Sequence, residues 1–580
     1  MRNGTAALPP HRPADRGRAS RTPLERLTVS RFRLLPLAAA AAAASLLLAG
    51  CSSAAGNEGT SATASTDPVT GGTLTYLEQQ AHTNLYPPAG GFYPNGGILN
   101  QITDKLTYQN PETLEIEPWI AESWEVNADA TQYTFTVRDG VTFSDGTPLD
   151  AAAVAKNFDT YGLGNPALKQ PVSEVINNYD HSEVLDEHTV RFFFTKPSPG
   201  FLQGTATIGS GLVSLATLAK NFDELGNATA IIGSGPFVVE SEELGKQVDL
   251  VAREDYDWAP ESSENQGRPY LDGITVIVTG EDSVRIGSLL SGQGDLIRQV
   301  QAYDEEQVTS QGYEVYARAT NGVNDSISFH PENPLVSDLR VRQALLHATD
   351  SAEIVETLFS KNYPQATSVL ASTAAGYIDL SDQLEFDPEE SERLLDEAGW
   401  TVGADGVRHK DGQKLELAIY ESLPQPQNRQ VLQLVAQQWA KVGVTLSVKA
   451  GDAGSKTTDE LDPAKSPLVV SIVGRADPDV IKSQFYPTNR NSLLQAGGSA
   501  PTATFRDDTL NGLLEAETSE PNREARLAAT QEVQKHLIAQ AYNIPLFEEP
   551  QVYAGAPYVE GLGFEAVGRP SFYTTWLAEH

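Results

Sequence analysis

The chain has 580 residues, of which 40% are apolar and 8% aromatic. This composition excludes a disordered protein, and the length exceeds what one hydrophobic core supports, so two or more domains or lobes are expected. The formal net charge is −36, which argues against a partner that is a nucleic acid or an anionic lipid surface. The acidic balance leaves two interpretations open: attraction for cationic ligands, or a secreted protein that its surface charge keeps soluble.

The chain begins with a basic segment and an apolar run. Residues 1–50 hold 8 Lys and Arg and 2 Asp and Glu, a net charge of +6. The apolar run from Leu34 to Gly50 is short and rich in Ala, which suits a signal peptide better than a membrane-spanning helix. It ends in Leu48-Ala49-Gly50-Cys51, and this pattern resembles the lipobox of bacterial lipoproteins. Residues 1–50 are therefore predicted to be a lipoprotein signal peptide, with Cys51 as the lipidated first residue of the mature chain.

A tether is predicted to follow the lipid anchor. Cys51 is the only cysteine, so no disulfide can form within the chain. Residues 51–70 are mostly Ser, Thr, Ala and Gly, a composition typical of a flexible linker. Folded sequence is expected from Gly71 onward. The predicted location is the extracytoplasmic face of the cell membrane, where the lipid holds the protein.

Strands dominate the first part of the folded sequence. Leu74–Tyr76 is predicted to form the first strand. Apolar and polar residues alternate over Tyr133–Val137 and again over Val190–Phe194, which indicates strands with one buried face. Asp139-Gly140 is predicted to turn the chain, so that residues 141–143 continue the strand before it as a hairpin.

Helix signals are clearer in the second half. Asp387 is predicted to cap a helix that starts at Pro388, with Glu390 as the partner in a capping box and Gly399 at the end. Ser337 is predicted to cap an earlier helix.

Two further patterns involve helices. An apolar face over Val431–Trp439 predicts a helix that stops at Gly443, before a strand over Val444–Val448. Gly292 and Gly294 are predicted to close the helix that holds Leu289 and Leu290. Such helix-then-strand units indicate α/β lobes.

No catalytic motif stands out from the rest of the sequence. The segment Gly451–Thr457 imitates a phosphate-binding loop, but Ser455 occupies the position where a Walker A motif has Gly. The nine histidines include no pair with the spacing of a helical metal site. The chain is therefore predicted not to be an enzyme, and no cofactor or metal site is predicted.

Several segments in order along the chain resemble the family 5 extracellular solute-binding proteins, which serve ABC importers of dipeptides, oligopeptides and nickel. The resemblance runs from about Gly71 to the C-terminus. Each segment alone is a weak signal, whereas their shared order is specific. The segments are Ile116–Trp124 with Tyr133–Val141, Phe143–Leu149 with Ala151–Phe158, Ile232–Phe237, Asp338–Leu345, and Leu394–Trp400.

The resemblance implies an α/β fold of the periplasmic-binding-protein type (type II, or Venus-flytrap), in which two lobes close on a ligand like a clamp. An extra subdomain belongs to the first lobe. Lobe I would span 71–324 and 548–580 with its subdomain at about 105–233, and lobe II would span 325–547. The hinge would lie at two chain crossings, near 322–326 and 547–551, where Gly322 could absorb a dihedral change.

The implied function is capture of a small solute by a monomeric, lipid-anchored substrate-binding protein. The solute would be a peptide or another carboxylate-bearing compound, and the partners would be the permease and ATPase subunits of an ABC transporter. A ligand-sensing receptor of the same fold is the alternative. A secreted hydrolase is a third and weaker one, because catalytic motifs are missing.

The loop after the first strand borders the ligand in this family. Glu78, Gln79 and Gln80 are therefore expected to face the cleft, where they could hydrogen-bond a solute, although a solvated loop has the same pattern. Phe92 and Tyr93 could add an aromatic wall or could pack in the core.

In dipeptide-binding relatives an aspartate holds the peptide ammonium and an arginine holds the carboxylate. Arg429 falls on the position of that arginine. Aligning Asp477-Pro478-Asp479 with the family's Asp-Pro-Asp places Gly474 where the aspartate would be, and Arg475 follows it. The alignment predicts a lost amine anchor, a site for an anionic solute, and weak binding of ordinary peptides. Two alternatives stay open: Asp477 could replace the aspartate, or Arg475 could pair with an acidic residue.

Overall fold

The computed structural model describes residues 67–579, except 423–424, 426, 452, 461 and 488–504. The described residues all belong to one compact unit. Cys51, the predicted signal peptide and most of the predicted tether lie outside the described residues. Among the described residues, no helix is long and apolar enough to cross a membrane.

A seven-stranded sheet forms the base of the first lobe. The first strand, β1, pairs in parallel with β10 and β11, and the outer strands pair antiparallel. In spatial order the strands are β12 (Glu314–Arg318), β21 (Gln551–Gly555), β11 (Leu296–Arg298), β1 (Thr73–Glu78), β10 (Gly273–Val278), β9 (Gln247–Ala252) and β8 (Phe237–Glu243). Because β21 comes from the C-terminal part of the chain, the end of the chain completes the sheet that its beginning starts.

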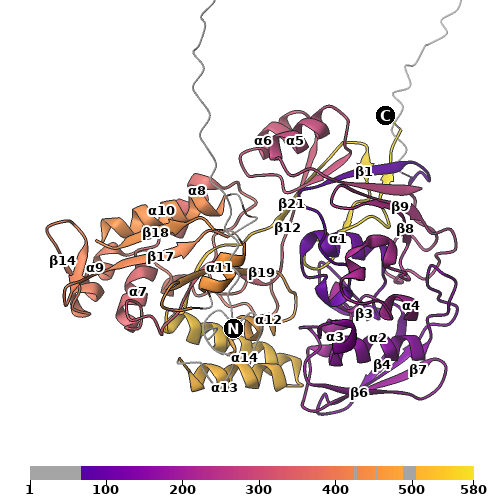
Figure 1. Cartoon of the computed structure of the whole chain (residues 1–580), viewed down its shortest axis with the longest axis horizontal. Coiled ribbons are helices and arrows are strands. Elements are labelled where there is room, and N and C mark those ends of the chain that lie inside the picture. Colours follow the sequence, from indigo (N-terminus) through magenta and orange to yellow (C-terminus); the bar gives the residue numbers. More distant parts are fainter. Residues whose placement is uncertain are drawn as a thin grey trace, which may run out of the picture. The chain divides into compact units, whose positions relative to one another are not determined.

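A four-stranded antiparallel sheet is inserted between β1 and β8, within the predicted subdomain. Its spatial order is β4 (Ala121–Val126), β5 (Gln132–Val137), β7 (Thr189–Phe194) and β6 (Tyr179–Val184). Helix α2 (Ala151–Leu163) packs on this sheet (Figure 1). The predicted strands over Tyr133–Val137 and Val190–Phe194 are confirmed as β5 and β7.

The second lobe contains a three-stranded antiparallel sheet and a parallel strand pair. The sheet has the order β19 (Leu468–Val473), β13 (Val323–Phe329) and β20 (Asn543–Phe547), and the pair is β17 (Glu416–Tyr420) with β18 (Thr445–Lys449). Helices cover these strands, and α13 and α14 lie side by side (Figure 1). The helices are α7 (Leu339–His347), α8 (Ser351–Leu358), α9 (Pro388–Glu397), α10 (Asn428–Lys441), α11 (Ala453–Glu460), α12 (Val480–Phe485), α13 (Asp508–Ser519) and α14 (Arg523–Ala539).

The remaining elements of the first lobe are short. Its helices are α1 (Tyr93–Ile102), α3 (Phe201–Gly204), α4 (Leu215–Leu218), α5 (Asp282–Leu290) and α6 (Glu305–Ser310). The strand β2 (Thr107–Gln109) pairs with β3 (Ile116–Pro118). Near the C-terminus, β22 (Val559–Glu560) pairs with β25 (Trp576–Leu577), and β23 (Gly563–Phe564) pairs with β24 (Pro570–Ser571). In the second lobe, β14 (Thr401–Val402), β15 (Arg408–Lys410) and β16 (Gln413–Lys414) form a small sheet.

The chain crosses from one large sheet to the other twice, between β12 and β13 and between β20 and β21. Gly322 lies in the first crossing, and a Cβ there would lie 1.8 Å from the carbonyl oxygen of Val473. This close approach, rather than a freely rotating backbone, is what requires glycine at position 322. The lobe boundaries themselves stay a prediction.

Buried apolar side chains form two large clusters, one for each lobe. The first is rich in aromatic residues and includes Phe135, Phe158 and Phe192. The second includes Leu345 and Trp439, and it reaches the seven-stranded sheet through residues such as Ile297 and Val552. Two cores of this kind satisfy the expectation that a single core would not support the chain.

Local predictions of helix ends are partly confirmed. Asp387 caps α9, because its Oδ1 accepts a hydrogen bond of 2.9 Å from the backbone N–H of Glu390. Gly399 follows this helix with a φ of +86°. The capping box is wrong, however, since the side chain of Glu390 pairs with Arg393. The backbone N–H of Asp387 donates instead to the carbonyl of His347.

Two other local predictions are wrong. The cap of α7 is Asp338 rather than Ser337, because the Asp338 carboxylate accepts from the backbone N–H of Arg340. Residues 141–143 do not continue β5 as a hairpin. Instead, Thr142 forms an isolated antiparallel β-bridge with Pro148. The strand β5 pairs with β4 and β7. The helix over Val431–Trp439 and the helix that ends before Gly292 are confirmed as α10 and α5.

Candidate functional site

A cavity of about 610 Å³ lies where the two lobes meet. Its wall includes the segment after β1, the start of α1 and residues 563–574 from the first lobe, and residues 472–476 at the end of β19 from the second. Its aromatic lining residues are Phe92, Tyr93, Tyr108, Trp119, Tyr256, Phe564 and Tyr573. Such a mixture of aromatic walls and a few charged groups is typical of a small-molecule site.

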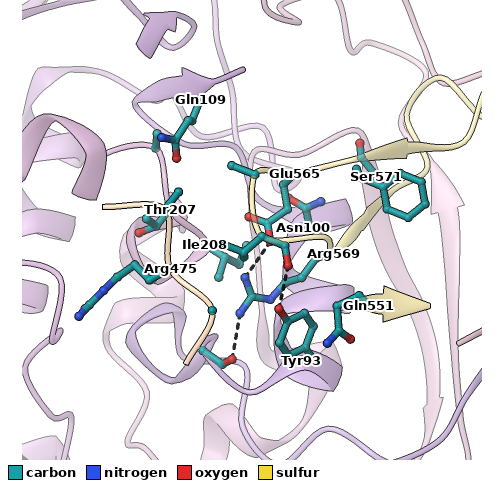
Figure 2. Close-up of a pocket in the computed structure, with 18 of the residues that line it drawn as sticks. Tyr93, Asn100, Gln109, Thr207, Ile208, Arg475, Gln551, Glu565, Arg569 and Ser571 are labelled. Atoms are coloured by element: carbon teal, nitrogen blue, oxygen red, sulfur yellow. Dashed lines mark hydrogen bonds and ion pairs between the residues drawn. The ribbon is translucent and has the colours of Figure 1, made fainter. Parts of the chain in front are cut away.

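Tyr93 and Arg569 form one side of the cavity. The Tyr93 hydroxyl donates to the carbonyl of Val567 at 2.7 Å, and the Arg569 guanidinium carbon lies 4.5 Å from the centre of the Tyr93 ring. Arg569 also pairs with Glu565 at 2.7 Å. Figure 2 shows this cluster, with Arg569 between Tyr93 and Glu565. Burial raises the pKa of Tyr93 well above its usual value, so the residue remains a neutral donor.

Arg298 faces the cavity from β11 because Glu78 holds it. The strands β1 and β11 are parallel neighbours, which brings the last residue of each together. Arg298 Nη2 and Glu78 Oε1 lie 2.8 Å apart, and both side chains are buried. Arg298 Nη1 also donates to the Gln551 side chain at 2.9 Å. Glu78 therefore belongs to the strand rather than to the loop after it, and it does not line the main cavity.

Lys105 is a third buried cation on the cavity wall. Its Nζ donates to the Asn100 side chain and lies 5.5 Å from the centre of the Trp119 ring. Among the described residues, no carboxylate lies within ion-pair distance of Nζ. Its neighbour Asp104 accepts hydrogen bonds from Tyr256 and Trp258 instead. Burial lowers the pKa of Lys105 to about 8.

The residues predicted from the sequence divide into two groups. Gln79, Gln80, Phe92, Tyr93 and Arg475 line the cavity, whereas Glu78, Arg429 and Asp477 do not. Arg429 is half-exposed and pairs with Glu421 at 2.7 Å. This pairing with Glu421, outside the cavity, differs from the expectation that Arg429 holds the carboxylate of the solute. Direct contact of the lining residues with a solute stays a prediction.

The Asp-Pro-Asp segment lies inside a network of ion pairs. Asp477 Oδ2 accepts from Arg526 Nη1 at 3.0 Å, and Arg526 also reaches Glu517 at 3.1 Å. Arg475 Nε lies 3.4 Å from Asp479. Its side chain points away from the cluster around Arg569 (Figure 2). Asp477 is thus already neutralised, and of the alternatives that the sequence left open, the pairing of Arg475 with an acidic residue is the one seen.

Sequence analysis missed seven charged residues of the wall: Lys105, Glu174, Glu264, Arg298, Glu549, Glu565 and Arg569. None lies in a motif that marks it. Arg298 ends a short apolar strand, which is only a weak signal of a binding residue. Arg569 reaches the cavity because the C-terminal part of the chain returns to the first lobe, and local sequence does not reveal this return. Among the described residues, no group of three or more His, Cys, Asp or Glu could hold a metal ion.

Comparison with known proteins places these features in a wider context. The family model described as "Bacterial extracellular solute-binding proteins, family 5 Middle" matches residues 115–491. The heme-binding protein A of Haemophilus influenzae is 26% identical over 506 residues, which cover 82% of this chain and 86% of the relative. The glutathione-binding protein GsiB of Escherichia coli strain K12 is 26% identical over 374 residues, 63% of this chain and 68% of the relative.

Two solved structures show the same fold. NikA from Brucella suis, solved in complex with Fe(III)-EDTA, has a TM-score of 0.72 at 24% identity and covers 87% of this chain and 99% of its own. The oligopeptide-binding protein AppA from Bacillus subtilis, solved with a nonapeptide, has a TM-score of 0.72 at 20% identity. It covers 88% of this chain and 100% of its own.

Proposed function

Because the chain belongs to the family 5 bacterial extracellular solute-binding proteins, we propose that it is the lipid-anchored substrate-binding protein of an ABC importer. It would capture a peptide or a peptide-like, carboxylate-bearing solute between its lobes and deliver it to a membrane permease. Its curated relatives include binding proteins for heme and for glutathione.

The observation that carries this proposal is the cavity of about 610 Å³ between the lobes. Cavities of several hundred Å³ enclose ligands of small-molecule size. Lys105 on its wall is a cation that suits a carboxylate group, and the aromatic side chains suit apolar parts of a solute. A clamp closes because its ligand binds the closed state better, and a nearly complete shift takes roughly 5 kcal/mol of differential affinity.

Native mass spectrometry of protein purified without denaturation tests capture. We expect a retained solute of small-molecule mass that is released on unfolding. Solution scattering tests closure, and the particle should be more compact with solute than after its removal. A protein that never retains or binds a small solute would contradict the proposed function.

Membrane fractionation tests the lipid anchor separately. The change Cys51→Ala should move the protein from the membrane to the soluble fraction or the medium, because no acyl chain can then be attached. The neighbouring change Ser52→Ala is the matched control and should leave the protein on the membrane. Membrane retention of the Cys51 variant would show that the anchor is not at this cysteine.

A further inference from the structure

A small recess of about 20 Å³ lies at the two chain crossings, next to the main cavity. Two carboxylates, Asp325 and Glu549, line it together with amide side chains and the aromatic residues Phe359, Tyr363 and Phe547. Glu549 also lines the main cavity, so it stands between the two spaces. The main cavity and the recess therefore adjoin each other at Glu549.

The two carboxylates come from different crossings. Asp325 is on β13 next to the first crossing and is 1% exposed. Glu549 lies in the second crossing, between β20 and β21. Since both crossings belong to the predicted hinge, a group bound between these side chains would contact both connections at once.

Neither carboxylate has a cationic partner within ion-pair distance among the residues that the structure describes. The Gln425 amide donates to Glu549 Oε2, and Asp325 Oδ1 is buried without any hydrogen-bond partner. A buried acceptor of this kind is costly unless a donor binds it.

The other buried charges of the main cavity are mostly compensated. Arg298, Arg475 and Arg569 each pair with a carboxylate, which also accounts for Glu565. Among the buried or half-buried charged lining residues within the described ranges, Lys105 and Glu549 are those without an opposite charge within 4 Å. The cavity thus offers one cationic group and one anionic group to a solute.

We propose that Glu549 and Asp325 bind a primary ammonium group of the solute, whose carboxylate faces Lys105 in the main cavity. This inference rests on the proposed function and narrows the solute to a compound with both an amine and an acid group. It also supplies, at a different place in the fold, the amine anchor that is missing at Gly474.

The chemistry of the recess favours an ammonium group over a bare metal ion. A metal ion needs oxygen ligands on most sides, but the amide nitrogens of Gln301 and Asn428 also face this space without partners. An ammonium group donates three directed hydrogen bonds, which Glu549, Asp325 and the unpartnered Gln425 Oε1 can accept. The amides of Gln301 and Asn428 can donate to the remaining carboxylate oxygens.

The electrostatic state of the two acids agrees with this assignment. Burial raises the pKa of Glu549 to about 7, although Arg298 and the hydrogen bond from Gln425 lower it. Burial also raises the pKa of Asp325 well above its usual range, and the charge of Glu549 adds to the effect. A bound cation would lower both of these pKa values, because it favours the ionised form of each carboxyl group.

The test compares two pools of di- and tripeptides, one with free amines and one in which every amine is acetylated. Binding to the mature chain, freed of retained solute, is measured at pH 7.5 by native mass spectrometry. We expect the wild-type protein to prefer the free-amine pool by at least about tenfold, since losing one partner of a dry ion pair is costly. The isosteric change Glu549→Gln should abolish that preference, and Asp325→Asn should reduce it.

Two controls make the result decisive. Glu306 is an exposed carboxylate that lines neither the cavity nor the recess, so Glu306→Gln should leave the preference unchanged. The Glu549→Gln protein should melt no lower than the wild type without solute, which separates a binding role from a structural one. Equal binding of both pools, or an intact preference in the Glu549→Gln protein, would overturn the inference and leave the proposed function standing. If the wild type bound neither pool and retained no solute, the proposed function would fail as well.

Discussion

Two buried acidic clusters of this molecule differ in how their charge is compensated. In the second lobe, Asp477, Asp479 and Glu517 surround the guanidinium groups of Arg475 and Arg526. At the chain crossings, Asp325 and Glu549 lie together without a cation among the described residues within ion-pair distance. The first cluster holds two guanidinium groups for its three carboxylates, whereas the second holds no cation among the described residues.

The difference separates structural acids from candidate binding acids. The positions of the Asp-Pro-Asp segment draw attention to Asp477, but Arg526 occupies both of its carboxylate oxygens. A solute amine would have to displace a buried guanidinium, which is costly. Glu549 has no such competitor, so its position in the fold, rather than its place in a motif, makes it the better anchor.

The largest effect is expected from removing Arg526 from the acidic cluster of the second lobe. Arg526→Met would leave Asp477 and Glu517 buried without compensation, so the free energy of unfolding should fall by about 3–5 kcal/mol. Urea unfolding measures the loss. Arg393→Met is the control, because Arg393 forms an exposed ion pair on α9 and its removal should cause no measurable change. Equal midpoints for the two variants would mean that the cluster contributes little.

At the chain crossings, the contribution of Glu549 to stability should change with pH in the opposite sense to that of an ion-paired acid. The folded protein holds a proton on Glu549 up to about pH 7, whereas an ordinary glutamate loses it near pH 4.5. The contribution of Glu549 to stability is therefore present below pH 4.5 and is lost as the pH rises to 7. Without solute, the free energy of unfolding of the Glu549→Gln protein should therefore rise relative to that of the wild type over this pH range, by up to about 3 kcal/mol.

Melting curves of both proteins at pH 5 and pH 8 test this expectation. Comparison with the wild type is needed because burial also raises the pKa of Glu517, to about 8, and of Asp479, to about 6. These groups are common to both proteins, so the difference reports on Glu549 together with its effect on the neighbouring Asp325. A difference that stays constant with pH would show that Glu549 titrates normally.

Asp477→Asn should separate stability from binding. Burial alone would raise the pKa of Asp477, but Arg526 outweighs it and keeps this pKa below the usual value. Removing the charge should cost about 2 kcal/mol of stability, because a buried guanidinium loses a partner. The preference for free-amine peptides should persist, since Asp477 does not line the cavity. Loss of that preference at pH 7.5, where the variant remains folded, would restore Asp477 as the amine anchor.

The smallest effect is expected at Arg429. Its guanidinium is half-exposed and pairs with Glu421 outside the cavity, so Arg429→Ala should change neither the melting temperature nor the affinity for peptides measurably. A clear drop in affinity for carboxylate-bearing peptides would reinstate the family alignment at this position.

Much of the local structure could be predicted from the sequence because its causes are local. The cap of α9 depends on Asp387 and a backbone N–H three residues later, and the alternation in β5 depends on every second side chain. The prediction at Ser337 missed by one residue, because Ser337 and Asp338 are both good caps and only backbone geometry distinguishes them. The hairpin after Asp139-Gly140 failed because β5 has other partners on both sides.

The sequence by itself determined the family, the two-lobe α/β fold and several element ends, through short patterns that occur in order along the chain. Only the tertiary structure decided which charges are neutralised. Glu78 and Arg298 are 220 residues apart and Asp477 and Arg526 are 49 apart, yet each pair is in contact. Ion pairing depends on distance in space and on the removal of water, and neither is encoded in the spacing of residues along the chain.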